Sequence, residues 1–155
     1  MFGETLFGAA ATTFFMAMVP VIELRGAIPV GVAAGLPVWV ATVVAVIGNM
    51  VPIPFILLLL RPVFRWMRRF PRMRRFIALL ERRALQKGET VHRYRTIGLI
   101  VLVAIPLPGT GAWTGALVAD MLNMRMKYAL PAIFAGVCIA GLIVSLAMMG
   151  LIHLI

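Results

Sequence analysis

Two charged residues, Glu23 and Arg25, stand in an otherwise apolar stretch, residues 20–29, that proline and glycine interrupt. A charge at hydrocarbon depth costs at least about 2.5 kcal/mol, so it should face a partner or water and is a functional candidate by default. The planar guanidinium of Arg25 suits bidentate binding of an oxyanion. A buried Glu23 could exchange protons. The alternative interpretation is a structural ion pair between the two side chains at the tip of a hairpin.

A second interrupted stretch, residues 105–114, has the sequence IPLPGTGAWT. Thr110 is expected to be the N-cap of a following helix, and in the first stretch Pro29 is expected near the first position of another. Helix N-termini favour anions, and glycines let a ligand approach the backbone. We therefore predict a site for a phosphate or carboxylate group that is built from Arg25, Gly26, Gly109, Thr110, Gly111, Trp113 and Thr114.

Asp120 is the second carboxylate, after Glu23, that is a candidate for proton coupling, since a buried carboxylate can carry protons. A solvated, interfacial Asp120 is an equal alternative. The sequence contains no nucleophile–base constellation, no metal-ligand spacing and no phosphate-binding loop, so we expect neither enzyme activity nor a cofactor. The single cysteine, Cys138, lies in an apolar run and is expected to serve packing.

The composition predicts an integral membrane protein. Of the 155 residues, 63% are hydrophobic and only 13% are charged, and the mean hydropathy is +1.04. A soluble domain of this size does not need so much apolar sequence. The length suggests one domain, residues 1–155, and the first four residues carry no positive charge, so we expect no cleavable signal peptide.

The positive charge is concentrated between residues 61 and 96, which hold twelve of the fifteen lysines and arginines. A basic loop between membrane segments indicates the cytoplasmic side. Its apolar residues recur at three- and four-residue steps, interrupted near Pro71, which predicts an amphipathic helix on the anionic headgroups of the inner leaflet. Nucleic acid is not an expected partner, because membrane topology alone requires such a loop.

The basic segment separates two halves, residues 1–60 and 97–155, that follow the same plan. Each half begins with an apolar stretch, which proline and glycine interrupt, and continues with a short apolar segment. A long apolar run follows, residues 38–60 in the first half and 128–155 in the second. The long runs can cross a hydrocarbon core of about 30 Å, whereas the pieces beside each break are mostly too short. We predict an all-α protein in which each half is a re-entrant hairpin plus one transmembrane helix. A four-span bundle is the alternative, because residues 5–22 could just span.

The membrane topology follows from the number of crossings on each side of residues 61–96, if that segment is cytoplasmic. The first hairpin would then enter from outside and the second from inside, which relates the halves by inverted topology. Both termini would lie outside the cytoplasmic membrane of a prokaryote. So small a chain is expected to form a homodimer that encloses a cavity.

Two motifs, ELRGAIPVG at residues 23–31 and PLPGTGAWTGAL at residues 106–117, closely resemble the putative small multi-drug export protein family of prokaryotes. More distantly the chain is similar to the DedA superfamily, whose members have paired re-entrant hairpins with acidic residues and arginines. Some members are implicated in proton-dependent translocation of undecaprenyl phosphate. The resemblance implies that Glu23 matches the first-hairpin acid and Arg25 a substrate-facing arginine. No arginine stands within residues 109–117, which departs from the DedA pattern.

Three functions are compatible with these features. The first is proton-coupled translocation of an anionic amphiphile, such as a polyprenyl phosphate, by Arg25 and the helix N-termini. The second is efflux of cationic drugs, with Glu23 as the membrane carboxylate. The third is a non-transporting scaffold whose basic helix recruits lipids or partners.

Overall fold

The computed structural model describes residues 2–85, 90–107 and 109–155, and every regular element in these ranges is an α-helix. The predicted all-α class is confirmed. Residues 86–89 of the predicted basic segment and Pro108 of the second break lie outside the described residues. The helices are α1 Phe2–Met18, α2 Glu23–Ala33, α3 Val38–Met50, α4 Pro52–Met67, α5 Pro71–Leu85, α6 Thr90–Ala104, α7 Ala112–Met121 and α8 Met126–Leu154.

Two segments are long and apolar enough to cross a membrane. They are Val38–Met67, which comprises α3 and α4, and Met126–Leu154, which is α8. At about 1.5 Å per residue, each is longer than a hydrocarbon core of about 30 Å. The apolar parts of α1 and α6, Thr5–Met18 and Tyr94–Ala104, are shorter. The prediction of a membrane protein with two long apolar runs is therefore confirmed at the level of helix length and composition.

The first long run differs from its prediction in two respects. The helix is interrupted at Val51, because Pro52 has no N–H to continue the hydrogen-bond ladder and instead begins α4. In addition, α4 continues to Met67, so the basic segment begins inside a helix rather than after residue 60.

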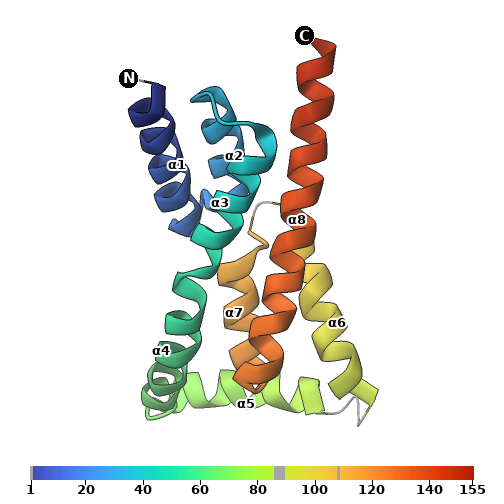
Figure 1. The fold of residues 1–155 in the computed structure, drawn as a ribbon. Helices are drawn as coiled ribbons and strands as arrows, with labels where there is room; N and C mark the ends of the chain where they lie inside the picture. The colour runs from blue at the N-terminus through green and yellow to red at the C-terminus, as the bar shows by residue number, and fades with distance from the viewer. Residues whose placement is uncertain (1, 86–89, 108) are drawn as a thin grey trace.

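The helices form two groups along the molecule (Figure 1). Helices α1, α2 and α3 pack together beside the C-terminal part of α8, while α4, α6 and α7 surround its N-terminal part. Helix α5 lies across the end that is opposite both termini. The connections α1–α2 and α6–α7 consequently meet near the middle of the molecule.

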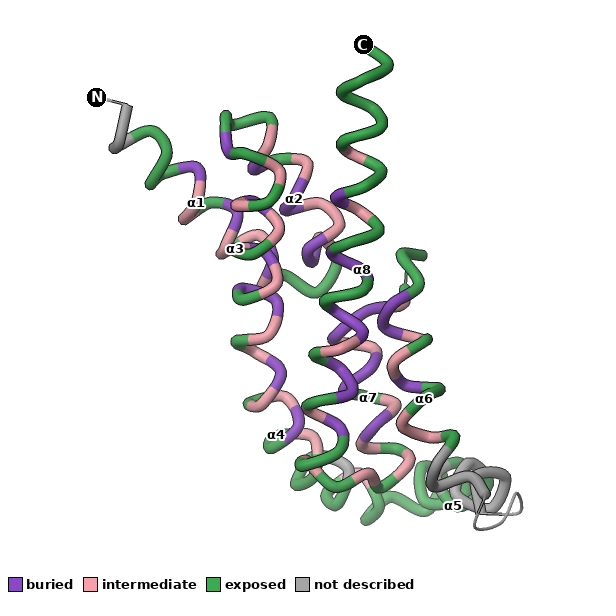
Figure 2. The backbone as a smooth tube through the Cα atoms, turned by 45° about the vertical axis from the view of Figure 1, so that its right-hand side comes forward, coloured by how far each residue is buried: buried purple, intermediate pink, exposed green. Residues whose placement is uncertain are grey.

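Buried residues are concentrated along the inner faces of both groups, whereas α5 is largely exposed (Figure 2). Small residues allow this close packing. A Cβ atom at Gly48 of α3 would overlap the carbonyl of Phe14 in α1, and one at Gly136 of α8 would overlap Val103 of α6. Because lipid tails are as apolar as the helices, such close backbone approach is a main source of helix association in membranes.

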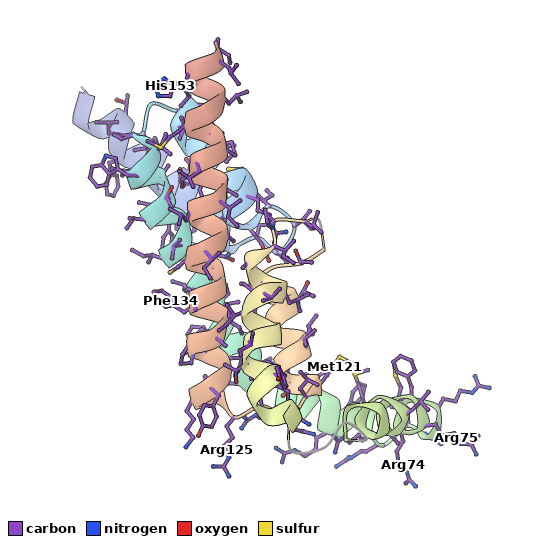
Figure 3. All side chains as sticks on the ribbon, turned by 90° about the vertical axis from the view of Figure 1, so that its right-hand side faces the viewer. Arg74, Arg75, Met121, Arg125, Phe134 and His153 are labelled. Atoms are coloured by element: carbon purple, nitrogen blue, oxygen red, sulfur yellow. The ribbon has the colours of Figure 1, made fainter. Side chains whose placement is uncertain are left out.

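Helix α5 is basic and amphipathic, as the periodicity predicts, and it begins at Pro71, where the interruption is predicted. Its described side chains are exposed. Arg74 and Arg75 point away from the helix bundle (Figure 3). The basic charge therefore gathers at one end of the molecule, far from His153 near the end of α8.

Candidate functional site

Glu23 is the first residue of α2, and its side chain is only 4% exposed. Its φ of 48° is unusual for a residue other than glycine. The prediction that a helix starts near Pro29 is wrong, since α2 begins six residues earlier and contains Pro29 in its interior. The sequence does not distinguish a proline in the first turn of a helix from one in its interior, because its fixed φ fits both positions. In the interior, proline removes one backbone hydrogen bond.

The carboxylate of Glu23 lies at the N-terminus of α7. Its Oε1 accepts a hydrogen bond from the backbone N–H of Trp113, over 3.4 Å. Gly111, the N-cap of α7, makes room for it, since a Cβ atom at this position would overlap the carboxylate. A carboxylate is favourable here because the first N–H groups of a helix have no partner within the helix and form the positive end of its dipole. Glu23 thus occupies the place where the sequence suggests a bound anion.

Arg25 makes the reciprocal contact with the end of α6. Its guanidinium Nη2 donates to the carbonyl of Ile105 and to Oγ1 of Thr110, each over 3.0 Å, and Nη1 donates to the carbonyl of Leu107. The last carbonyls of a helix lack partners within it, and a cation there is favourable. Ile105 directly follows α6, Leu107 lies two residues further on, and both carbonyls also accept hydrogen bonds from within residues 105–110. The two charges of α2 therefore bind the two ends of the second break.

Thr110 does not cap α7, and that prediction is wrong. No side chain makes the cap hydrogen bond of α7. The hydroxyl of Thr110 lies 2.7 Å from the carbonyl of Ile105 and 2.8 Å from that of Leu107. Its position is set by the carbonyls of the α6 end and by Arg25, and Gly111 takes the cap position with its φ of 143°.

Trp113 connects the same junction to the end of α1. Its indole Nε1 donates to the carbonyl of Met18 over 3.3 Å. The side chain also forms one wall of a groove of about 490 Å³ that is lined only by apolar residues and proline. The other lining residues are Met18, Val51, Pro52, Phe55, Ile56, Leu59, Leu60 and Val63.

The remaining predicted site residues have varied positions. Thr114 donates from Oγ1 to the carbonyl of Gly109 over 2.9 Å. Gly109 is exposed, with a φ of 86° and open space where a Cβ atom would stand. Gly26 packs against the side chain of Ile22, which would overlap a Cβ atom there. The structure therefore brings all the predicted substrate-binding residues to the junction region.

Asp120 lies apart from this junction, in the last turn of α7. Burial raises the pKa of its carboxyl, and the guanidinium groups of Arg61 and Arg68 partly offset that rise. An acid in the last turn of a helix is unfavourable towards the dipole, and the two arginines compensate for it. The two carboxylates predicted for proton coupling are thus at opposite ends of α7.

The sequence interpretation missed three backbone groups of the junction and one buried polar side chain of α3. The carbonyls of Met18, Ile105 and Leu107 are backbone groups, which residue type does not reveal. Asn49 of α3 is fully buried, and its side-chain oxygen and nitrogen have no hydrogen-bond partner in the described part of the chain. A polar residue in a long apolar run was the signal that could have identified it.

No curated protein and no solved structure matches the chain significantly. A family model described as "Putative small multi-drug export protein" matches residues 23–143, which are more than three quarters of the chain and run from Glu23 into α8. The chain therefore belongs to the putative small multi-drug export protein family.

Proposed function

We propose that this protein is a small membrane exporter in which amphiphilic compounds move from the apolar groove to the junction of the two breaks. The observation that carries the proposal is the position of Trp113. Its side chain is a wall of the apolar groove, and its backbone N–H binds the buried carboxylate of Glu23. A hydrophobic surface beside a single buried charge is suited to a ligand with an apolar body and a charged end.

We further propose that α3–α4 and α8 cross the cytoplasmic membrane, while α1–α2 and α6–α7 enter it from opposite sides as re-entrant hairpins. The basic helix α5 would then lie on the cytoplasmic headgroups, with both termini outside. Non-helical backbone at membrane depth must be satisfied within the protein. Arg25 donates hydrogen bonds to the carbonyls of residues 105 and 107, which lie in such non-helical backbone, and these bonds support the proposal.

The charges at the junction favour a cationic amphiphile. Nη1 and Nη2 of Arg25 donate to two carbonyls and a hydroxyl, while its buried Nε has no hydrogen-bond partner in the described part of the chain. The first turn of α7 is bound by Glu23. A ligand anion would have to displace these partners. A ligand cation would instead meet the carboxylate of Glu23, and protonation of Glu23 would weaken both the binding of the cation and the contact to α7. That exchange would couple proton entry to release of the compound.

Translocation of an anionic amphiphile, such as a polyprenyl phosphate, is the second candidate. It is favoured by the exposed backbone of Gly109, which has open space above it and lies one residue from the Thr110 hydroxyl that Arg25 binds. In this case Arg25 would exchange a carbonyl partner for the phosphate. Gly26, Gly111 and Thr114 would keep the backbone of the junction in place.

Transport by reconstituted vesicles under a pH gradient tests the proposal, with a fluorescent lipophilic cation and a fluorescent lipid phosphate as the two probes. Glu23→Gln keeps an acceptor for Trp113 but removes the charge, so we expect at least tenfold slower transport of the cation. Asp120→Asn is the matched control, because it removes a carboxylate from the far end of α7, and it should retain more than half of the rate. The proposal would be contradicted if the Glu23→Gln variant transported the cation at the wild-type rate. The second candidate would be established if the wild type transported the lipid phosphate but not the cation, and if Arg25→Gln abolished that transport.

A further inference from the structure

A second pocket lies at the opposite end of α7 from the junction. It has a volume of about 410 Å³ and is lined by Arg95, Thr96, Asn123, Met124, Arg125 and Tyr128. These residues come from the beginning of α6, the α7–α8 turn and the first turn of α8. Figure 3 shows Arg125 at the start of α8, at the same end of the molecule as α5 and far from His153. The pocket is therefore on the basic side of the molecule.

Arg95 is held in place on one side of this pocket. Its Nη1 donates to the carbonyl of Leu122, the C-cap of α7, over 3.1 Å. Its Nε is buried and has no hydrogen-bond partner in the described part of the chain. A buried donor of a charged group that has no partner is destabilising. Arg95 therefore brings a fixed positive charge to this side of the pocket.

The opposite side of the pocket adds further positive charge. Arg125 is exposed and occupies the N-cap position of α8, where no side chain makes the cap hydrogen bond. The N-terminus of this 29-residue helix presents N–H groups and the positive end of its dipole. Arg61 approaches from α4, with its Nη2 3.5 Å from the carbonyl of Met124. Thr96, Asn123 and Tyr128 can each donate a hydrogen bond as well.

We infer that this pocket binds the phosphate group of an anionic membrane lipid. Two guanidinium groups and a helix N-terminus match the charge and the oxygen geometry of a phosphate. Ile97, which follows the lining residue Thr96 on α6, is exposed and offers an apolar surface for the rest of the lipid. Basic pockets between membrane helices on the cytoplasmic side are known to take lipid headgroups. The inference is independent of the substrate of the junction.

Lipid binding to the purified full chain in detergent tests this inference, with phosphatidylglycerol, phosphatidylcholine and inorganic phosphate as the probes. The double variant Arg95→Gln/Arg125→Gln should bind phosphatidylglycerol at least tenfold more weakly than the wild type. The matched control is Arg74→Gln/Arg75→Gln, which loses the same charge from α5, where the side chains point away from the bundle. Its affinity should stay within twofold of the wild type.

Arg125→Gln alone provides a test that does not disturb the bond of Arg95 to Leu122, and it should weaken binding several-fold. Equal losses in the two double variants would overturn the inference, because they would indicate attraction by net charge alone. Equal affinity for phosphatidylcholine and phosphatidylglycerol would also overturn it. Displacement of the lipid by millimolar inorganic phosphate would identify a site for the free ion instead of a lipid.

Discussion

The backbone N–H of Trp113 donates to Oε1 of Glu23 over 3.4 Å and so joins the first turns of α7 and α2, ninety residues apart in sequence. Two residues along, Arg25 makes the complementary contact with the end of α6 through the carbonyl of Ile105. One short segment, residues 23–25, therefore stabilises both helix ends of the other half. Any motion that separates the two breaks must leave these groups without partners or supply new ones.

Replacing Gly111 should damage this junction. Gly111→Ala places a methyl group where the carboxylate of Glu23 lies, at a φ of 143° that alanine rarely adopts. We expect a loss of at least about 2 kcal/mol in the free energy of unfolding, from the clash and the backbone strain together. Unfolding in mixed micelles measures it. Gly109→Ala is the control, since its φ is also positive but open space surrounds it, and it should lose about 1 kcal/mol from strain alone. Equal losses would contradict the contact with Glu23.

The shape of the Arg25 side chain should matter as much as its charge. Arg25→Lys keeps the positive charge, but a single ammonium group cannot reproduce the planar fork that reaches Ile105, Leu107 and Thr110. We expect faster hydrogen exchange at residues 105–111, by about tenfold, which corresponds to about 1.4 kcal/mol of lost local stability. Exchange measured by mass spectrometry tests this, with residues 38–50 of α3 as the internal reference. Unchanged exchange at residues 105–111 would show that the fork is dispensable.

Filling the apolar groove should slow export of bulky compounds. Leu59 lines the groove and its neighbour Leu58 does not, although the two side chains are similarly exposed, at 63% and 58%. Leu59→Trp should therefore reduce transport of a bulky lipophilic cation at least fivefold, because the indole occupies the space of the ligand. Leu58→Trp should stay within twofold of the wild type. Transport assays in vesicles measure both, and similar rates for the two variants would exclude the groove as the route.

The proposed orientation in the membrane can be measured with single cysteines in a Cys138→Ala background. Arg74→Cys reports on α5 and His153→Cys on the far end of α8, which lie at opposite ends of the molecule. A membrane-impermeant maleimide should label position 153 in intact cells and position 74 only after permeabilisation. Labelling of both positions in intact cells would contradict the cytoplasmic location of the basic helix.

Local sequence was sufficient for the class of the protein and for much of its segmentation. Composition and periodicity can be read directly from one sequence. They are sufficient to predict the high apolar content, the two long runs that form α3–α4 and α8, and the cluster of arginines. Proline and glycine likewise mark the two interruptions, because they act on the backbone at their own positions. The exact helix starts were less certain. Pro29 and Thr110 each fit a helix beginning by residue type, but α2 and α7 begin elsewhere.

Sequence alone determined that this protein has a membrane composition, a basic segment and two broken apolar stretches with charges in the first. Tertiary structure alone decided what those charges touch. Glu23 and Arg25 are two residues apart and, from sequence, were compatible with a ligand site or with an ion pair. They bind the start of α7 and the carbonyls that follow α6 because the folded chain places N–H and C=O groups of the second break against them, and backbone groups at membrane depth must find partners within the protein. Such pairing depends on contacts between residues 80 to 90 positions apart, which local spacing does not specify.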